Sequence, residues 1–323
     1  MKENIIRFAF AAFLLTALQM SLLSQEKLKI VVIPKSNIAV FWKSVHAGVK
    51  LGSVALGNVE VVWRAPLEET ALQQISIVEQ CIAEGVSGIV LAPLEKDPLA
   101  MPVVKAMKKK IPILIFDSEL KGISGKDYIS FVGIDNKKSG VLAGEQLAKL
   151  LGGKGKVVIL QGIPGQSNIM EREKGFLEAM AKYEGIRIIE KDTYASNTVD
   201  DAMNVSLKMA GKLKEADGIF CSYEQSTLGM LLALRKLHLS GKVKFVGFDT
   251  PVPAVDALKK GEISELIAQD PARMGFLSVK AIVDYIRGKK VPQMVDVPVQ
   301  IITRENLNNP EVQKLFALPM MSE

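Results

Sequence analysis

Polar side chains follow three apolar runs of this chain, at the points where we expect buried strands to end. Asp117 follows the run 113–116, Asp249 follows 243–248, and Gln269 follows 264–268. Ligands of open α/β sheets bind beyond the carboxyl ends of the strands. These side chains are therefore predicted to gather at one edge of the sheets. Further polar and aromatic candidates follow other predicted strands in the same way: Lys35, Ser118, Tyr194 and Tyr223.

An arginine and an aromatic pair add a chemical character to this set. Arg172 falls in the first turns of a helix that opens near residues 166–168, and Phe41-Trp42 stands at the start of another helix. A guanidinium and carboxylates can hydrogen-bond neighbouring hydroxyls in pairs. Flat aromatic rings can cover the apolar faces of a sugar or polyol, and small-ligand sites combine such walls with a few directional polar groups.

Each candidate also has an ordinary structural explanation when it is taken alone. An aspartate after a strand often caps a helix or forms a turn. Phe41-Trp42 fits a hydrophobic core, and Arg172 fits a surface ion pair with Glu171 or Glu173. The argument for a binding site depends on all of these residues falling at the same edge.

Signatures of catalysis and metal binding are sparse. The two histidines, His46 and His238, stand in helical patterns without the spacing of a metal site, and GxSxG and GxGxxG are missing. The glycine-rich stretch 152–156 runs into a strand and is interpreted as a turn that ends a helix. We therefore expect no catalytic residues, no metal and no cofactor, with an enzyme acting on small carbohydrates kept as the less favoured alternative.

Apolar strands alternate with amphipathic helices from residue 28 onward. Continuous apolar strands with intervening helices predict parallel sheets covered on both faces. The alternation restarts at residue 156, so the α/β fold is predicted to have two similar halves, with a seam near Asp135-Asn136 and Asn136 capping the next helix. The run 295–302 is predicted as one last strand before a polar tail. The length of 323 residues suits two domains of ordinary size.

The first 24 residues have the pattern of a secretory signal peptide. Lys2 and Arg7 precede a mainly apolar run from Phe8 to Leu23, which is shorter than the ~20 residues of a comfortable membrane span. Cleavage after Ser24 would take the net charge from +6 to +5, because it removes Lys2, Arg7 and Glu3. We expect a periplasmic protein, with a retained membrane anchor as the alternative.

The overall charge and the cysteines argue against two further classes of protein. The 41 Lys and Arg residues are scattered among 35 Asp and Glu, whereas nucleic-acid binding needs one clustered basic face. Cys81 and Cys221 are far apart in apolar surroundings, and we expect two buried, unpaired thiols rather than a disulfide scaffold.

The chain from about residue 28 to about residue 290 resembles the periplasmic sugar-binding proteins of ABC transporters, in particular the ribose-binding group. The resemblance depends on a combination of short motifs. These are Phe41-Trp42 with Gly48, the strand 111–117 ending in Asp117, the stretch 161–165 with Glu171-Arg172-Glu173 and Gly175-Phe176, Leu228-Gly229, the stretch 246–249, and Ile267-Ala268-Gln269 with Gly275. Sugar-responsive repressors share this core but carry an N-terminal helix-turn-helix, where this chain has an export signal.

The resemblance implies two Rossmann-like lobes with parallel sheets, joined by three hinge strands and closing on a sugar. It places residues 27–135 plus about 270–295 in one lobe, 136–269 plus about 296–310 in the other, and 311–323 in a tail. It implies ring stacking by Phe41, Trp42 and Tyr194. It also implies hydroxyl contacts by Asp117, Arg172, Asp249 and Gln269.

Four positions depart from the pattern of the ribose-binding group. Lys35 replaces a small polar residue, Ala39 replaces an asparagine, Ser118 replaces an arginine, and Tyr223 replaces another asparagine. These differences argue against ribose itself as the ligand. Lys35 is predicted to accept an acidic group or reach a ring oxygen, and Tyr223 to add a third wall.

The resulting functional prediction is an exported, monomeric solute-binding protein. It would capture a monosaccharide, sugar derivative or polyol and deliver it to the permease subunits of an ABC transporter. The alternative within binding proteins is a sensor that presents a sugar-like signal to a receptor or sensor kinase.

Overall fold

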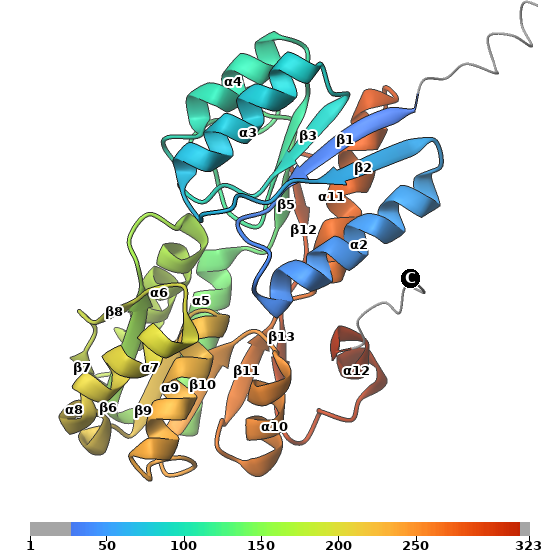
Figure 1. The fold of residues 1–323 in the computed structure, drawn as a ribbon. Coiled ribbons are helices and arrows are strands. Elements are labelled where there is room, and N and C mark those ends of the chain that lie inside the picture. The colour runs from blue at the N-terminus through green and yellow to red at the C-terminus, as the bar shows by residue number, and fades with distance from the viewer. Residues whose placement is uncertain (1–26, 317–323) are drawn as a thin grey trace, which may run out of the picture.

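The computed structural model describes residues 27–316, which form two α/β lobes stacked end to end (Figure 1). The sheet of the N-terminal lobe has the strand order β12-β5-β4-β3-β1-β2. Its strands are β1 (Leu28–Ile33), β2 (Val59–Trp63), β3 (Gly88–Leu91), β4 (Ile113–Phe116), β5 (Phe131–Gly133) and β12 (Met294–Asp296). All neighbouring strands pair in parallel. The central strands β3 and β4 are buried along their whole length, which explains their unbroken apolar sequences.

Helices cover both faces of this sheet. On one face, α2 (Val40–Leu56) packs against α11 (Pro271–Ile286), and on the other lie α3 (Ala71–Glu84) and α4 (Ala100–Lys108). Close approach of α2 and α11 requires glycine at the crossing. A Cβ atom at Gly48 would lie 1.8 Å from the carbonyl oxygen of Ala272, and one at Gly275 would lie 2.2 Å from that of Val45.

The seven-stranded sheet of the C-terminal lobe has the order β13-β11-β10-β9-β6-β7, with β8 pairing separately to β6. Its strands are β6 (Lys154–Gly162), β7 (Gly185–Glu190), β8 (Tyr194–Ala195), β9 (Gly218–Cys221), β10 (Lys244–Phe248), β11 (Glu265–Ala268) and β13 (Gln300–Ile302). Among the strand pairs of this sheet within the described residues, only β11 and β13 are antiparallel. The helices are α5 (Asn136–Leu150), α6 (Ser167–Met180), α7 (Val199–Lys208), α8 (Ala210–Glu215), α9 (Glu224–Lys236) and α10 (Val252–Lys260).

The chain crosses between the lobes three times. It leaves the N-terminal lobe between β5 and α5, returns between β11 and α11, and leaves again between β12 and β13. The crossings are short, and in Figure 1 they lie side by side where the two lobes meet. The predicted fold class, two lobes with parallel sheets connected by three hinge segments, is therefore confirmed.

Three local predictions differ from the structure. The run 295–302 is two strands in different sheets, because a hinge crossing divides it. Asp135, not Asn136, caps α5 by accepting the backbone N–H of Lys138 at 2.9 Å. The predicted tail contains a helix, α12 (Pro310–Phe316), and its Val312 is buried against the C-terminal lobe.

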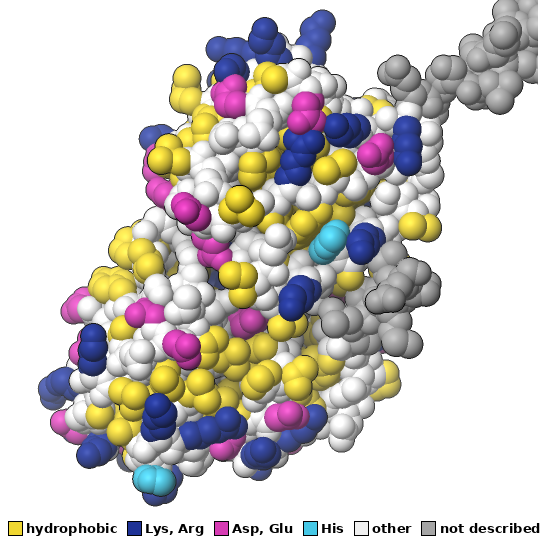
Figure 2. Space-filling model, in the orientation of Figure 1, with side chains coloured by type: hydrophobic (Ala, Val, Ile, Leu, Met, Phe, Trp, Pro, Cys, Tyr) yellow, Lys and Arg dark blue, Asp and Glu magenta, His cyan; other side chains and the backbone are white. Residues whose placement is uncertain are grey.

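Other expectations fall partly outside the described residues. The predicted leader, residues 1–24, lies outside residues 27–316. Within that described part, no helix is both long and apolar enough to cross a membrane. Cys81 and Cys221 are buried and unpaired, as predicted. On the face shown in Figure 2, Lys and Arg side chains are interspersed with Asp and Glu rather than gathered in a basic patch.

Candidate ligand-binding site

A cavity of about 90 Å³ lies between the lobes, at the carboxyl edges of both sheets. Both lobes contribute to its wall. The lining residues are Lys35, Ser36, Ile38, Ala39, Phe41, Trp42, Glu69, Leu94, Asp117, Gln166, Asn168, Ile169, Arg172, Asn197, Tyr223, Glu224, Gln225, Asp249 and Gln269. The structure thus brings together eight of the ten predicted site residues, and the exceptions are Ser118 and Tyr194.

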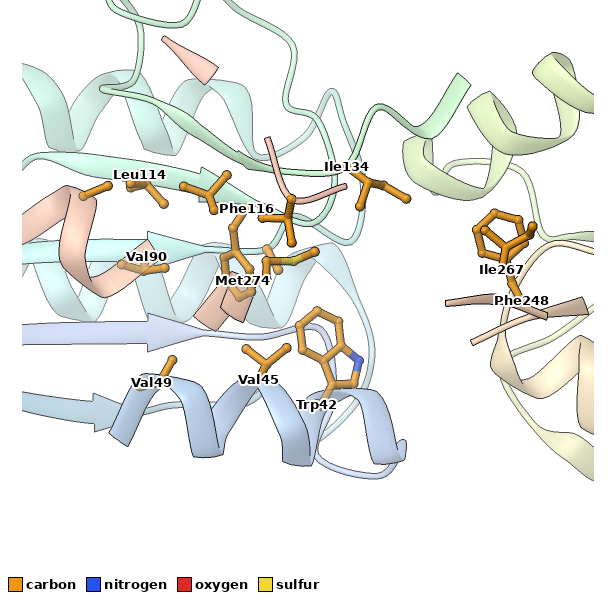
Figure 3. Close-up of a cluster of buried hydrophobic side chains, with 14 of the residues drawn as sticks. Trp42, Val45, Val49, Val90, Leu114, Phe116, Ile134, Phe248, Ile267 and Met274 are labelled. Carbon is orange, nitrogen blue, oxygen red and sulfur yellow. The ribbon is translucent and has the colours of Figure 1, made fainter. Parts of the chain in front are cut away.

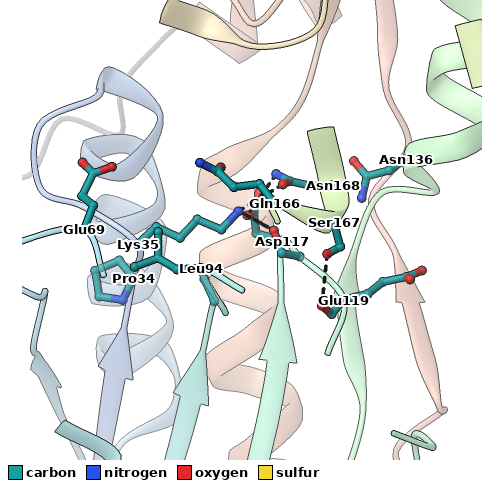
Figure 4. A network of polar contacts seen from close by, with 12 residues as sticks. Pro34, Lys35, Glu69, Leu94, Asp117, Glu119, Asn136, Gln166, Ser167 and Asn168 are labelled. Atoms are coloured by element: carbon teal, nitrogen blue, oxygen red, sulfur yellow. Dashed lines mark hydrogen bonds and ion pairs between the residues drawn. The ribbon is translucent and has the colours of Figure 1, made fainter. Parts of the chain in front are cut away.

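Lys35 and Asp117 form a buried ion pair on the N-terminal side of the cavity (Figure 4). Nζ of Lys35 lies 3.0 Å from Oδ2 of Asp117 and 3.1 Å from Oδ1 of Asn168, and it also donates to Oγ of Ser118. An ammonium group has three donors, so these three acceptors account for all of them. Burial lowers the pKa of Lys35, and Asp117 opposes that effect.

Ser118 contacts the carboxylate of Asp117. Its hydroxyl accepts from Lys35 and lies 3.0 Å from Oδ2 of Asp117, and its side chain is buried outside the cavity wall. Asp117 itself has a φ angle of 63°, a left-handed conformation that turns the chain sharply at the end of β4. The pair Asp117-Ser118 therefore positions a carboxylate, whereas a direct ligand contact by Ser118 does not fit the cavity.

Arg172 reaches the cavity from α6 on the C-terminal side. Its Nε donates to Oδ1 of Asn136 at 2.9 Å, and Nη1 donates to the carbonyl of Ser222 at 3.0 Å. The guanidinium carbon lies 4.5 Å from the ring centre of Phe248, a cation–π contact. Nη2 is buried and has no hydrogen-bond partner among the described residues. Of the predicted alternatives for Arg172, the surface ion pair is therefore wrong.

Asp249 and Gln269 stand at the ends of the neighbouring strands β10 and β11. Nε2 of Gln269 donates to Oδ1 of Asp249 at 2.8 Å, while Oε1 of Gln269 is buried without a partner among the described residues. Burial raises the pKa of Asp249, and the nearby Arg172 lowers it. A buried polar atom without a partner costs free energy, so Nη2 of Arg172 and Oε1 of Gln269 are the places where a ligand hydroxyl would be most favourable.

Phe41 and Trp42 form the aromatic wall at the first turn of α2. The ring of Trp42 meets Phe41 edge-on at 5.0 Å and Phe116 edge-on at 6.0 Å, and its side chain is only 6% exposed. Figure 3 shows Trp42 at the cavity end of a buried cluster that continues into the N-terminal lobe through Val45 and Val49. Trp42 therefore belongs both to the hydrophobic core and to the wall of the cavity.

Tyr223 lines the cavity, and Tyr194 does not. The hydroxyl of Tyr223 lies 3.0 Å from the carbonyl of Ala195 and 2.9 Å from that of Ser196, so the ring is held from the C-terminal lobe. Tyr194 is 45% exposed and borders a separate surface hollow with Pro164, Glu173 and Lys174. The chain turns after β8, and Asn197 from the following loop reaches the cavity instead.

Direct contacts between the lobes surround the cavity. Asn168 contacts Lys35 at 3.1 Å, Ser167 donates to the carbonyl of Glu119 at 3.0 Å, and Asn197 donates to Glu69 at 3.1 Å. The first two contacts are visible in Figure 4. The lobes are therefore closed on each other in this structure.

Several residues that line the cavity were not predicted as site residues from the sequence. Asn168 stands at the start of α6 and Glu224 directly follows Tyr223 after β9, so their places after strands were a usable signal. Glu69 and Asn197 lie in loops, and only the closure of the lobes brings them together. Asn136 was predicted as a helix cap, but its side chain accepts from Arg172.

Two buried glutamates border this region. Burial raises the pKa of Glu173 to about 7, although its carboxylate accepts the backbone N–H of Gly162 and the hydroxyl of Ser222, both at 2.8 Å. Burial and the nearby Asp249 raise the pKa of Glu224 to about 7. The partners of Glu173 all belong to its own lobe, whereas Glu224 faces the other lobe.

Comparison with known sequences identifies the family. The sequence model of the periplasmic binding protein domain matches residues 30–290, which is most of the chain. The chain belongs to the periplasmic binding protein domain family. Members of this family are binding proteins rather than enzymes, and the predicted resemblance is confirmed.

Curated relatives of this periplasmic binding protein carry names that refer to sugars and polyols. The chain is 32% identical to a xylitol-binding protein of Mycolicibacterium smegmatis over 206 residues, which is 64% of this chain and 57% of that protein. It is 27% identical to the ribose import binding protein RbsB of Salmonella typhimurium over 268 residues, covering 82% of this chain and 87% of that protein. The match to the xylitol-binding protein thus spans little more than half of that protein's length.

Solved structures of sugar-bound proteins share the fold of this chain. A carbohydrate transporter solute-binding protein from Agrobacterium radiobacter, in complex with D-arabinose, superposes with a TM-score of 0.84 at 30% identity, covering 91% of this chain and 100% of that one. An ABC transporter solute-binding protein from Agrobacterium vitis, bound to α-D-tagatopyranose, gives a TM-score of 0.83 at 27% identity, covering 90% and 99%. The predicted function agrees with these relatives.

Proposed function

We propose that this protein is an exported solute-binding protein that captures a neutral monosaccharide, sugar derivative or polyol between its lobes and delivers it to an ABC permease. The observation that carries the proposal is the pair of unpartnered buried atoms, Nη2 of Arg172 and Oε1 of Gln269, in one cavity with Phe41 and Trp42. One is a donor and the other an acceptor, and a polyhydroxylated ligand offers both functions at each hydroxyl.

The charges in the cavity favour a neutral ligand. Lys35 is matched by Asp117, and Arg172 by Asp249. All three donors of Lys35 are already engaged by protein oxygens. The cavity wall also holds Glu69 and Glu224, so its acidic groups outnumber Lys35 and Arg172. A sugar acid would add a further negative charge to this wall, which is costly. The role proposed for Lys35 is to hold Asp117 rather than to bind an acidic group.

Each proposed contact has a place in the cavity. Asp117, Asp249, Arg172 and Gln269 hydrogen-bond the hydroxyls, and Phe41, Trp42 and Tyr223 cover the apolar faces of the ligand. Closure of the lobes around the bound molecule, a population shift between open and closed forms, produces the form that a permease recognises. We further propose a cleaved leader at residues 1–24, a periplasmic location, a monomeric state and no catalysis of its own.

Thermal unfolding of the leaderless protein with a ligand panel tests this proposal. The panel holds pentoses, hexoses, polyols and the corresponding sugar acids. A ligand at ~100 times its dissociation constant adds about 2.7 kcal/mol, which for a chain of this size raises the unfolding temperature by roughly 4 °C. We expect a shift with one class of neutral ligand and none with its acid. A larger shift with the acid, or turnover of the ligand, would contradict the proposal.

Delivery to a permease is tested separately from binding. The ligand-loaded protein is added to its ABC permease reconstituted in vesicles, and ATP hydrolysis is followed. We expect stimulation that requires the ligand. A sensor would instead bind the same ligand, leave the permease unstimulated and change the activity of a sensor kinase.

A further inference from the structure

The first turn of α2 has no cap of its own. The residue at the N-cap position is Ala39, which has no side-chain acceptor. The backbone N–H groups of Trp42 and Lys43 bond to the carbonyl of Ala39. The N–H groups of Val40 and Phe41 precede them, and the first N–H groups of a helix have no partner within the helix.

A carboxylate from the other lobe takes the place of the missing cap. Oε1 of Glu224 lies 3.4 Å from the N–H of Val40, and Oε2 lies 3.3 Å from the N–H of Phe41. Glu224 is the first residue of α9 and is buried. Its carboxylate therefore lies next to the N-termini of two helices, α2 of the other lobe and its own helix α9. The N-terminus of a helix favours a negative charge.

We propose that Glu224 caps α2 across the cleft in the closed form, and thereby couples closure of the lobes to the position of the aromatic wall. Phe41 and Trp42 belong to the turn that Glu224 completes. When the lobes separate, Glu224 moves away with α9, and the N–H groups of Val40 and Phe41 turn to water. Glu224 is thus a positioning residue, distinct from the groups proposed to contact the ligand.

The charges around Glu224 come from both lobes. Burial and the nearby Asp249, which follows β10, raise the pKa of Glu224 to about 7. The backbone N–H groups of Phe41 and Val40, and then Lys43 on α2, lower it. The measurements below are therefore made at pH 8, where the side chain is ionised.

The direct test is amide hydrogen exchange, followed residue by residue by NMR, in protein saturated with the ligand that the thermal panel identifies, because the contacts of Glu224 with Val40 and Phe41 belong to the closed form. In Glu224→Ala, the amides of Val40 and Phe41 should exchange about tenfold faster or more, and Glu224→Gln, which keeps one acceptor oxygen, should lie between. Glu184→Ala, an exposed carboxylate between α6 and β7, is the matched control and should change neither amide. Unchanged exchange at both amides in Glu224→Ala would overturn the proposal. This test rests on the proposed function, but the two fail differently: a ligand panel without a hit contradicts the proposed function, whereas unchanged exchange in ligand-saturated Glu224→Ala contradicts the cap alone.

The effect on ligand capture rests on the proposed function and is tested by a double-mutant cycle. Ala39→Asn supplies a favoured local cap. Glu224→Ala should weaken affinity about 2- to 30-fold in the native background, the range expected for losing one cap, and clearly less in the Ala39→Asn background. An equal loss in both backgrounds would mean that Glu224 contacts the ligand directly and would refute the cap.

Discussion

Nζ of Lys35 lies 3.0 Å from Oδ2 of Asp117, although the two residues follow strands that are not neighbours. Lys35 follows β1 and Asp117 follows β4, with β3 between these strands in the sheet. The side chain of Lys35 therefore reaches across one strand, and both groups are buried. The residue directly after Asp117 is Ser118, and the cation beside Asp117 comes from another strand.

This ion pair leads to a prediction about stability. Lys35→Met keeps most of the apolar stem but leaves Asp117 buried without its cation, and breaking a buried pair in this way costs about 3–5 kcal/mol. We expect that loss in urea-induced unfolding at neutral pH. Lys108→Met, an exposed lysine at the end of α4, is the control and should change stability by less than about 0.5 kcal/mol. The double variant Lys35→Met with Asp117→Asn should recover part of the loss. Equal stability of the two single lysine variants would refute a role for the pair.

Arg172 gives a prediction about affinity. Arg172→Lys keeps the charge but cannot reproduce a planar fork that bonds Asn136, Ser222 and the ligand together. We expect ligand affinity to fall roughly 10- to 100-fold, the range for losing one hydrogen bond to a charged group, as measured by calorimetric titration. The control Arg187→Lys, on an exposed position of β7, should bind as the native protein does. Native affinity in Arg172→Lys would exclude Arg172 from ligand recognition.

Glu173 gives a prediction about pH. Its pKa is about 7 in the folded protein against the ordinary value of 4.5, so between these values the folded state holds a proton that the unfolded state has released. The contribution of Glu173 to stability is therefore complete below about pH 4.5 and is lost as pH rises toward 7. We expect Glu173→Gln to flatten this decline in unfolding free energy and to be relatively most stabilising at pH 8. In the exposed control Glu178→Gln, the decline should persist. An unchanged pH profile in Glu173→Gln would show that Glu173 is ionised throughout.

The crossing of α2 and α11 gives a prediction about packing. In Gly48→Ala, the new methyl group would meet the carbonyl of Ala272 at 1.8 Å, so the helices must separate. Overpacking of this kind costs about 1–3 kcal/mol, and we expect such a loss in thermal or urea unfolding. Gly211→Ala in α8 meets no atom within 4 Å and should be neutral or stabilise by up to about 1 kcal/mol. Similar effects in the two variants would contradict the close approach at Gly48.

Much of the site was predictable because parallel strands impose a simple rule. Asp117, Asp249 and Gln269 each follow a buried strand, and the carboxyl ends of parallel strands lie at one edge of their sheet. Asp117 lies at this edge of the N-terminal sheet, and Asp249 and Gln269 lie at this edge of the C-terminal sheet. Arg172 was also predictable, because α6 starts from the same edge. Tyr194 broke the rule, since β8 is a two-residue strand off the main path of the sheet and its side chain points to another hollow.

The sequence by itself determined the alternation of strands and helices, the division into two lobes and the strand ends at which the candidate site residues lie, because hydrophobic periodicity and chain direction are local properties. Only the tertiary structure decided which polar atoms of these residues lack a hydrogen-bond partner among the described residues. That Lys35 is fully engaged, that Nη2 of Arg172 is not, and that Glu224 caps a helix of the opposite lobe all depend on contacts between residues distant in the chain. Such contacts follow from the closing of one lobe on the other, and no local pattern encodes that geometry.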